Sequence, residues 1–108
     1  MKSPDELASE LSRRGLEWAD LDAAANALEE ARKSLLAELS LQWTGESRAA
    51  ANDKALASAE YKLHVAQMCT ARKEANRARV RYDTYKVYVE LERTAESTRR
   101  AEVKAIPG

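Results

Sequence analysis

The sequence predicts an all-α fold in which a short N-terminal helix precedes a long antiparallel coiled-coil helical hairpin that assembles into an oligomeric helical bundle. The first observation is composition: the chain has no Phe, three Gly and two Pro, and both prolines, Pro4 and Pro107, lie near its ends. Its interior is rich in Ala, Leu, Glu, Lys and Arg, which is typical of helices and not of strands. The second observation is that apolar residues recur every seven positions, the coiled-coil period. We expect one helical domain over residues 1–108.

We expect the first helix over residues 4–14. Ser3 can cap its N-terminus, Pro4 suits the first helical position, and Glu6 completes a capping box. Gly15 comes next, and glycine is common just past the end of a helix. We therefore predict that Gly15 stops or bends the first helix.

Two longer helices should form the hairpin, over residues 18–43 and 59–105. The apolar seam of the first contains Leu21, Ala24, Leu28, Ala31, Leu35 and Leu39. The seam of the second contains Tyr61, Val65, Met68, Ala71, Ala75, Ala78, Tyr82, Tyr85 and Val89. A short connector, in which Ser58 can cap the last helix, makes the two helices antiparallel. This pairing places Leu21 near Tyr82 and Leu35 near Met68.

A second apolar stripe runs along the 59–105 helix, nearly opposite its seam. Val80, Val87 and Leu91 form this stripe, with Thr84 among them and Cys69 extending it backwards. A helix that is apolar on two opposite sides needs cover on both, and the 18–43 helix can cover only one. We therefore predict a homo-oligomer with Val80, Val87 and Leu91 at the interface between copies.

The stretch RARVRYDTYKVY, residues 77–88, combines three arginines and one lysine with three tyrosines. On a helical wheel Tyr82 and Tyr85 fall on the seam, so we expect both rings in the core. A line of basic residues at intervals of seven follows one border of the seam: Arg72, Arg79, Lys86, Arg93 and Arg100. We expect the acidic residues between positions 17 and 30 to neutralise much of this line within the hairpin.

Arg77, Arg81 and Tyr88 lie on the other border, where the hairpin offers no obvious acidic partner. Guanidinium groups bind phosphates in charge-assisted hydrogen bonds, and tyrosine rings stack on bases. These three residues are therefore our candidates for binding a ligand. A solvated helix face is an equally good explanation of the same three residues.

No pattern of a catalytic or metal site is present. The chain lacks a Gly-rich phosphate loop, a CxxC pair and an HExxH motif. His64, the only histidine, falls on or beside the seam, and Cys69, the only cysteine, has no catalytic partner nearby in the sequence. We expect no enzymatic activity, no cofactor and no metal.

Charge and hydropathy exclude further classes. Lys plus Arg number 18, as do Asp plus Glu, so a net charge of zero makes nucleic acid an unfavoured partner. No apolar run approaches the ~20 residues that a membrane span needs, and the N-terminus has no signal-peptide pattern. We expect a reduced protein in the cytoplasm.

Two segments, RGLEWADLDAAANALEEARKSLLAEL and ARKEANRARVRYD, resemble small helical proteins of tailed phages and prophages, most of unassigned function. The resemblance implies a bacterial cytoplasm and, as functions, recombination accessories, host-takeover factors or inhibitors of bacterial defence. Our first hypothesis is a counter-defence protein that sequesters a nucleotide immune signal, such as a cyclic nucleotide, in pockets between subunits. The alternative is a coiled-coil adaptor or inhibitor that binds a host or phage protein.

Overall fold

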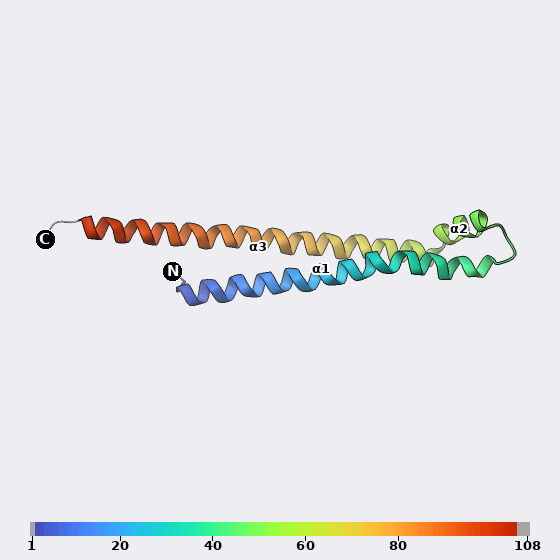
Figure 1. Ribbon diagram of the computed structural model, residues 1–108, viewed down its shortest axis with the longest axis horizontal. Coiled ribbons are helices and arrows are strands. Elements are labelled where there is room, and N and C mark those ends of the chain that lie inside the picture. The colour runs from blue at the N-terminus through green and yellow to red at the C-terminus, as the bar shows by residue number, and fades with distance from the viewer. Residues whose placement is uncertain (1, 106–108) are drawn as a thin grey trace.

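Two long antiparallel helices make up most of the molecule. The computed structural model describes residues 2–105, with α1 at Pro4–Ser40, a 3-10 turn η1 at Leu41–Trp43, α2 at Arg48–Ala57 and α3 at Ala59–Ala105. In Figure 1, α1 and α3 lie side by side in opposite directions, and α2 lies where the chain turns. Residues 2–105 contain no β-strand. The predicted all-α hairpin is confirmed, and assembly into a bundle stays a prediction.

The hairpin is a thin rod. Its radius of gyration is 24.5 Å, against ~13 Å for a compact domain of about 100 residues, and its two short axes measure 19 and 15 Å. With only two helices side by side along most of the rod, each can bury one stripe against the other. The opposite faces of α1 and α3 are therefore open to solvent or to partners.

Helix α1 is continuous, so the predicted division into helices at 4–14 and 18–43 is wrong. Gly15 lies inside α1 and does not end a helix. A Cβ atom on Gly15 would lie 3.3 Å from Cε2 of Tyr82, which is closer than ordinary van der Waals contact. The Tyr82 ring also packs against Trp18, with ring centroids 5.6 Å apart. Glycine at position 15 therefore allows close approach by an α3 side chain.

Serine side chains cap the starts of both long helices, as predicted. Ser3 Oγ accepts a hydrogen bond from the Glu6 backbone N–H at 3.2 Å, and Ser58 Oγ accepts one from the Tyr61 N–H at 3.2 Å. The Ser58 backbone is extended (φ −68°, ψ 149°), so this one residue separates α2 from α3. A serine at such a position satisfies an N–H group that has no partner within the helix.

The predicted seam of α3 faces α1. All nine of its residues are buried or half-buried, and Ala75 is among the most enclosed at 1% exposure. Towards the open end of the hairpin, Tyr85 and Val89 form a buried cluster with Leu7 of α1, against which Leu11 packs. The seven-residue period of α3 therefore predicted its buried side correctly.

The seam of α1 differs from the prediction. Ala24 and Ala31, which we expected on it, are exposed, whereas Ala25 is completely buried. Counting from Leu7 in alternating steps of four and three residues reaches Ala25 and then Leu28. Because α1 is continuous, Leu7 determines which later residues of α1 face α3. The prediction assigned Leu7 to a separate helix and therefore placed the wrong alanines on the seam.

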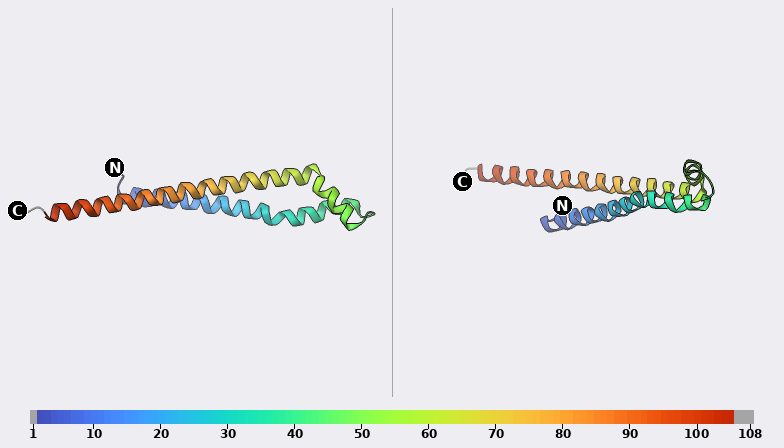
Figure 2. Two further views of the ribbon diagram at one scale, coloured as in Figure 1. Left: turned by 90° about the horizontal axis from the view of Figure 1, so that it is seen from above. Right: turned by 45° about the vertical axis from the view of Figure 1, so that its right-hand side comes forward.

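The pairing of α1 with α3 is shifted by at least one helical turn from the prediction. Gly15 and Trp18 lie against Tyr82, where we expected Leu21. His64, predicted on or beside the seam, lies with Nε2 2.7 Å from the carbonyl oxygen of Leu28. Both views in Figure 2 show α2 occupying the turn, so that α3 starts short of the end of α1. The extra helix at the turn changes the register.

We predict that Gly15→Leu lowers the free energy of unfolding by about 1–3 kcal/mol, although leucine is the better helix former by ~1 kcal/mol. The added side chain would displace the Tyr82 ring from its contact with Trp18. Gly45→Leu is the matched control, because a Cβ atom there has nothing within 4 Å. Urea denaturation at one protein concentration measures both variants. Equal stability of the two variants would contradict the close approach.

Candidate functional site

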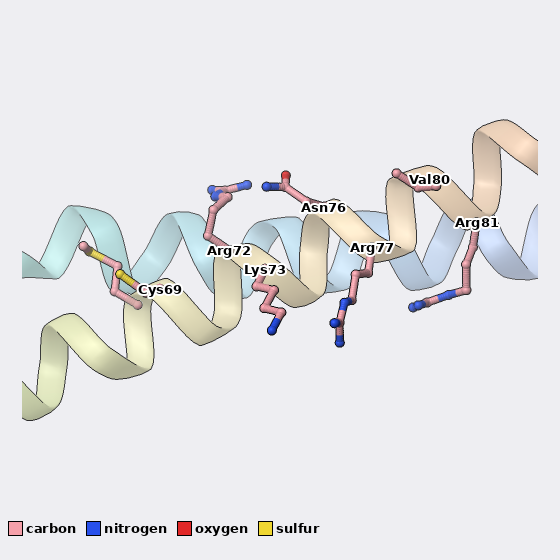
Figure 3. Close-up of a pocket in the computed structure, with 8 residues that line it drawn as sticks. Cys69, Arg72, Lys73, Asn76, Arg77, Val80 and Arg81 are labelled. Atoms are coloured by element: carbon pink, nitrogen blue, oxygen red, sulfur yellow. The ribbon is translucent and has the colours of Figure 1, made fainter.

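Basic side chains gather on one exposed side of α3. A shallow groove there is lined by Met68, Cys69, Arg72, Lys73, Asn76, Arg77, Val80 and Arg81, all of them residues of α3. Figure 3 shows Lys73, Arg77 and Arg81 pointing to one side of the helix. We call Lys73, Arg77 and Arg81 the cationic stripe.

The cationic stripe costs helix stability when it is unoccupied. Residues four apart are neighbours on a helix surface, and like charges at that spacing repel each other by some tenths of a kcal/mol per pair. The segment 72–81 contains five basic residues and one acidic residue. Among residues 2–105, neither Lys73 nor Arg77 forms an ion pair. An anion bound along the stripe would relieve this repulsion.

Arg72 belongs to the groove but is committed to the hairpin. Its Nη1 donates to Asp22 Oδ1 at 2.7 Å, and its Nη2 donates to Glu29 Oε1 and to Asn26 Oδ1, each at 2.6 Å. The hydrogen bonds from Arg72 hold the pKa of Glu29 below its ordinary value of 4.5, and the two carboxylates raise the pKa of Arg72. Arg72 therefore joins α3 to α1, as expected for the first residue of the basic line.

The rest of that basic line is not neutralised by α1. Arg100 lies 3.5 Å from Glu96 of its own helix. For Arg79, Lys86 and Arg93, no ion pair occurs among residues 2–105, so this part of the prediction is wrong. The shift in register explains the difference, because the acidic residues of positions 17–30 lie beside earlier residues of α3 than we expected.

Arg81 also departs from the prediction. We expected it to lack an acidic partner in the hairpin, but its Nη2 donates to Glu17 Oε1 at 2.9 Å. Glu17 is also 3.7 Å from Nη1 of Arg13. A guanidinium group carries five N–H donors, so Arg81 keeps donors beyond the one that Glu17 accepts. The ion pair holds the Arg81 side chain in place beside the groove.

Tyr88, the third predicted ligand residue, lies outside the groove. It is 11 residues from Arg77, or ~16 Å along a helix. Its ring lies 5.6 Å from that of Tyr85, and 41% of the residue is exposed. Tyr85 in turn lies under Arg14, whose Cζ is 4.6 Å from the ring centroid. Within one copy of the chain, Tyr88 and Arg77 do not form one site.

Lys73 and Asn76 are groove residues that the sequence analysis missed. The available signal was a run of residues four apart, from Cys69 through Lys73 and Arg77 to Arg81. The prediction rested on basic residues at the borders of the seam, and Lys73 lies on the opposite side of α3. A search for basic residues at intervals of four would have found the stripe.

The second apolar stripe of α3 is exposed in the single copy. Val80, Val87 and Leu91 have exposed fractions of 58%, 54% and 64%. Val80 also lines the groove, so the second apolar stripe lies next to the cationic stripe. Burial of such side chains is favourable by roughly 25 cal/mol per Å² of apolar surface.

A second groove lies between the start of α1 and the end of α3. Its apolar floor includes Leu7, Leu11 and Val89. Charges of both signs line its edge: Lys2, Glu92, Arg93, Glu96 and Arg100. Because these charges nearly balance, this groove attracts an anion less strongly than the cationic stripe does, and it does not attract a cation strongly either.

Residues 2–105 contain no group of three His, Cys, Asp or Glu side chains that could hold a metal ion. Cys69 is exposed and free. None of the helices described is both long enough and apolar enough to cross a membrane. His64 binds a backbone carbonyl of α1 and so helps to join the helices.

Comparison with protein families, with curated proteins and with solved structures finds no match for this chain. The resemblance to helical phage proteins therefore stays a prediction.

We predict that Arg72→Ala lowers the melting temperature at pH 7 more than Lys73→Ala, a change of its exposed neighbour that breaks no ion pair among the described residues. Because the folded-state pKa of Glu29 is depressed, its contribution to stability is present above about pH 4.5 and is lost as the pH falls through the lowered value. The difference between wild type and Arg72→Ala should therefore shrink below pH 4.5. Thermal melts followed by circular dichroism from pH 7 to pH 3 measure it.

A difference between wild type and Arg72→Ala that stays constant over this range would show that Glu29 is not held by Arg72.

Proposed function

We propose that the protein is a non-enzymatic binding protein that holds a phosphate-bearing nucleotide in a pocket formed by two copies of the chain. The observation that carries this proposal is the cationic stripe, in which Lys73, Arg77 and Arg81 lie at intervals of four residues beside the exposed Val80. Like charges at this spacing repel one another on a bare helix, and basic side chains bind phosphate oxygens in charge-assisted hydrogen bonds.

The residues on and near the stripe supply the interactions that a nucleotide needs. Arg77 and Arg81 can bind phosphate oxygens with paired N–H donors, and Lys73 adds a mobile charge. Tyr88 offers a partly exposed ring for stacking on a base. None of these interactions requires bond making or breaking, which agrees with a protein that sequesters a ligand.

A second copy is needed because small-molecule sites are concave and enclose most of the ligand. The groove on α3 is formed by one helix alone. Val80, Val87 and Leu91 are exposed next to it, and a second copy that covered them would add a wall to the groove. The proposed homo-oligomer thus follows from the same face as the proposed site.

The setting that we propose is the cytoplasm of a bacterial cell, where a phage protein of this kind would remove a nucleotide immune signal and so inhibit a defence system. The resemblance of residues 14–39 and 71–83 to helical phage proteins suggests this setting. The chemistry of the cationic stripe supports only the anionic ligand.

A second candidate function is that of a coiled-coil adaptor that binds a host or phage protein. The exposed apolar stripe favours it, because an amphipathic partner helix could cover Val80, Val87 and Leu91 as well as a second copy could. The two candidates differ in whether a purified protein binds nucleotides by itself.

We predict that Arg77→Ala weakens nucleotide binding about 10- to 100-fold, since a hydrogen bond to a charged group contributes on the order of 1.5–3 kcal/mol. Arg32→Ala is the control: it removes an exposed arginine of α1 that lies outside the groove. Calorimetric titration of cyclic nucleotides and cyclic ADP-ribose isomers, with helicity checked by circular dichroism, measures both variants. No heat from any nucleotide, together with co-purification of a host protein, would favour the adaptor.

We predict that Val87→Glu dissociates the oligomer while helix content stays unchanged. Burying an unpaired carboxylate costs several kcal/mol, so the interface would not form. Val103→Glu is the control, because Val103 is an exposed valine of α3 outside the predicted interface. Light scattering at micromolar concentration distinguishes the 12.0 kDa monomer from larger species. A wild-type protein of 12.0 kDa would overturn the predicted oligomer.

A further inference from the structure

We infer that two copies of the chain pair through α3 in antiparallel orientation, and that each ligand pocket combines Arg77 and Arg81 of one copy with Tyr88 of the other. The inference rests on the proposed function for the ligand, and on the exposed face of α3 for the pairing.

The outer face of α3 contains a second coiled-coil seam. The residues Val80, Thr84, Val87 and Leu91 follow one another in steps of four, three and four, which is the spacing of core positions in a coiled coil. All four are exposed, whereas Tyr82, Tyr85 and Val89 between them are buried or half-buried against α1. We call Val80, Thr84, Val87 and Leu91 the outer seam.

Antiparallel pairing about a two-fold axis packs the outer seam of one copy against the outer seam of the other, and no charged residue lies among the four paired positions. Leu91 then packs beside Val80 of the partner subunit, and Thr84 packs beside Val87 of the partner subunit. The two-fold axis repeats each contact, so four consecutive layers are filled by Val, Leu and Thr side chains. Arg77, at the edge of this region, faces Thr94 of the partner subunit.

Charge decides between antiparallel and parallel pairing. In a parallel pair Lys73 and Arg77, which continue the outer seam in the same steps, would meet their own copies. The segment 72–81, with five basic residues and one acidic residue, would lie against itself. Antiparallel pairing instead places this segment beside residues 90–99 near the end of α3, which contain three acidic residues and two basic residues. Complementary charge therefore favours the antiparallel pair.

The same pairing completes the ligand site. Arg81 and Tyr88 of the partner subunit fall between the same two layers of the outer seam and on the same border of it. Within one copy, Arg77 and Tyr88 are ~16 Å apart along α3. Across the pair, the exposed ring of Tyr88 lies beside the groove that Arg77 and Arg81 line, and it becomes the second wall. The two-fold axis generates two equivalent pockets.

On the opposite border of the outer seam, repulsion between like charges opposes this pairing. There Asp83 lies beside Glu90 of the partner subunit, and like charges across an interface oppose association. Arg79 and Lys86 each lie one turn before these carboxylates on α3 and offset part of the repulsion. Because the outer seam is opposite the α1 seam, the four long helices of the pair lie in a flat row.

Disulfide cross-linking of the full chain tests the orientation. In a Cys69→Ser background, Val80→Cys and Leu91→Cys are made separately, mixed, and oxidised. Cα atoms joined by a disulfide lie within ~7 Å, whereas positions 80 and 91 of one helix are ~16 Å apart. We expect covalent dimers that contain one chain of each variant, and none when either variant is oxidised alone.

Efficient cross-linking of Val80→Cys alone would overturn the inference, because only a parallel pair places position 80 beside itself. A second pair, Arg77→Cys with Thr94→Cys, leaves Val80, Val87 and Leu91 intact and is expected to give the same mixed pattern. Absence of cross-links from both pairs would show that this face is not the contact between copies.

Titration of wild-type protein with cyclic nucleotides and cyclic ADP-ribose isomers, set beside the cross-linking pattern, separates the orientation from the proposed function. Mixed cross-links with no heat from any nucleotide would leave the antiparallel pair standing and refute the nucleotide ligand. Nucleotide binding by wild-type protein that cross-links in the parallel pattern would refute the orientation alone.

Discussion

The close packing of α1 against α3 is the constraint on which the rest of the structure depends. Small residues make it possible: Gly15 admits the Tyr82 ring, and Ala25, Ala75 and Ala78 are almost entirely buried between the helices. Each helix brings a narrow stripe to this interface and leaves its other side free. The exposed valines and the unpaired cations of α3 are therefore consequences of a fold that has a single internal interface along most of its length.

The ion-pair network of Arg72 sets where the free side of α3 points. Arg72 binds Asp22 and Glu29 of α1, and about two and a half turns further along α3 the pair between Arg81 and Glu17 joins the helices again. Between them, Lys73 and Arg77 have no such anchor among the described residues. Ion pairs to α1 thus hold Arg72 and Arg81 in the groove on α3, and Lys73 and Arg77 between them are available for a ligand.

The sequence predicted the all-helical hairpin, the span and buried side of α3 and the two serine caps, because these follow from residue spacing and local hydrogen bonding. Its failures have a common origin. Gly15 has the residue type of a helix end, and only the distant Tyr82 explains its place inside a helix. Once α1 is continuous, its buried phase changes from Ala24 to Ala25, and the turn formed by α2 changes the register. The partner of Arg81 depends on that register, so no local pattern could have identified Glu17.

The elongated shape has a consequence for how the mass of this protein is determined. Compact proteins reach a radius of gyration of 24.5 Å only at about 500–600 residues, by the scaling of size with chain length. A single copy of the chain would therefore elute from a gel-filtration column ahead of globular standards of its own mass. Elution volume would mistake one copy for an assembly of several. Sedimentation equilibrium, which is independent of shape, reports the true number of chains.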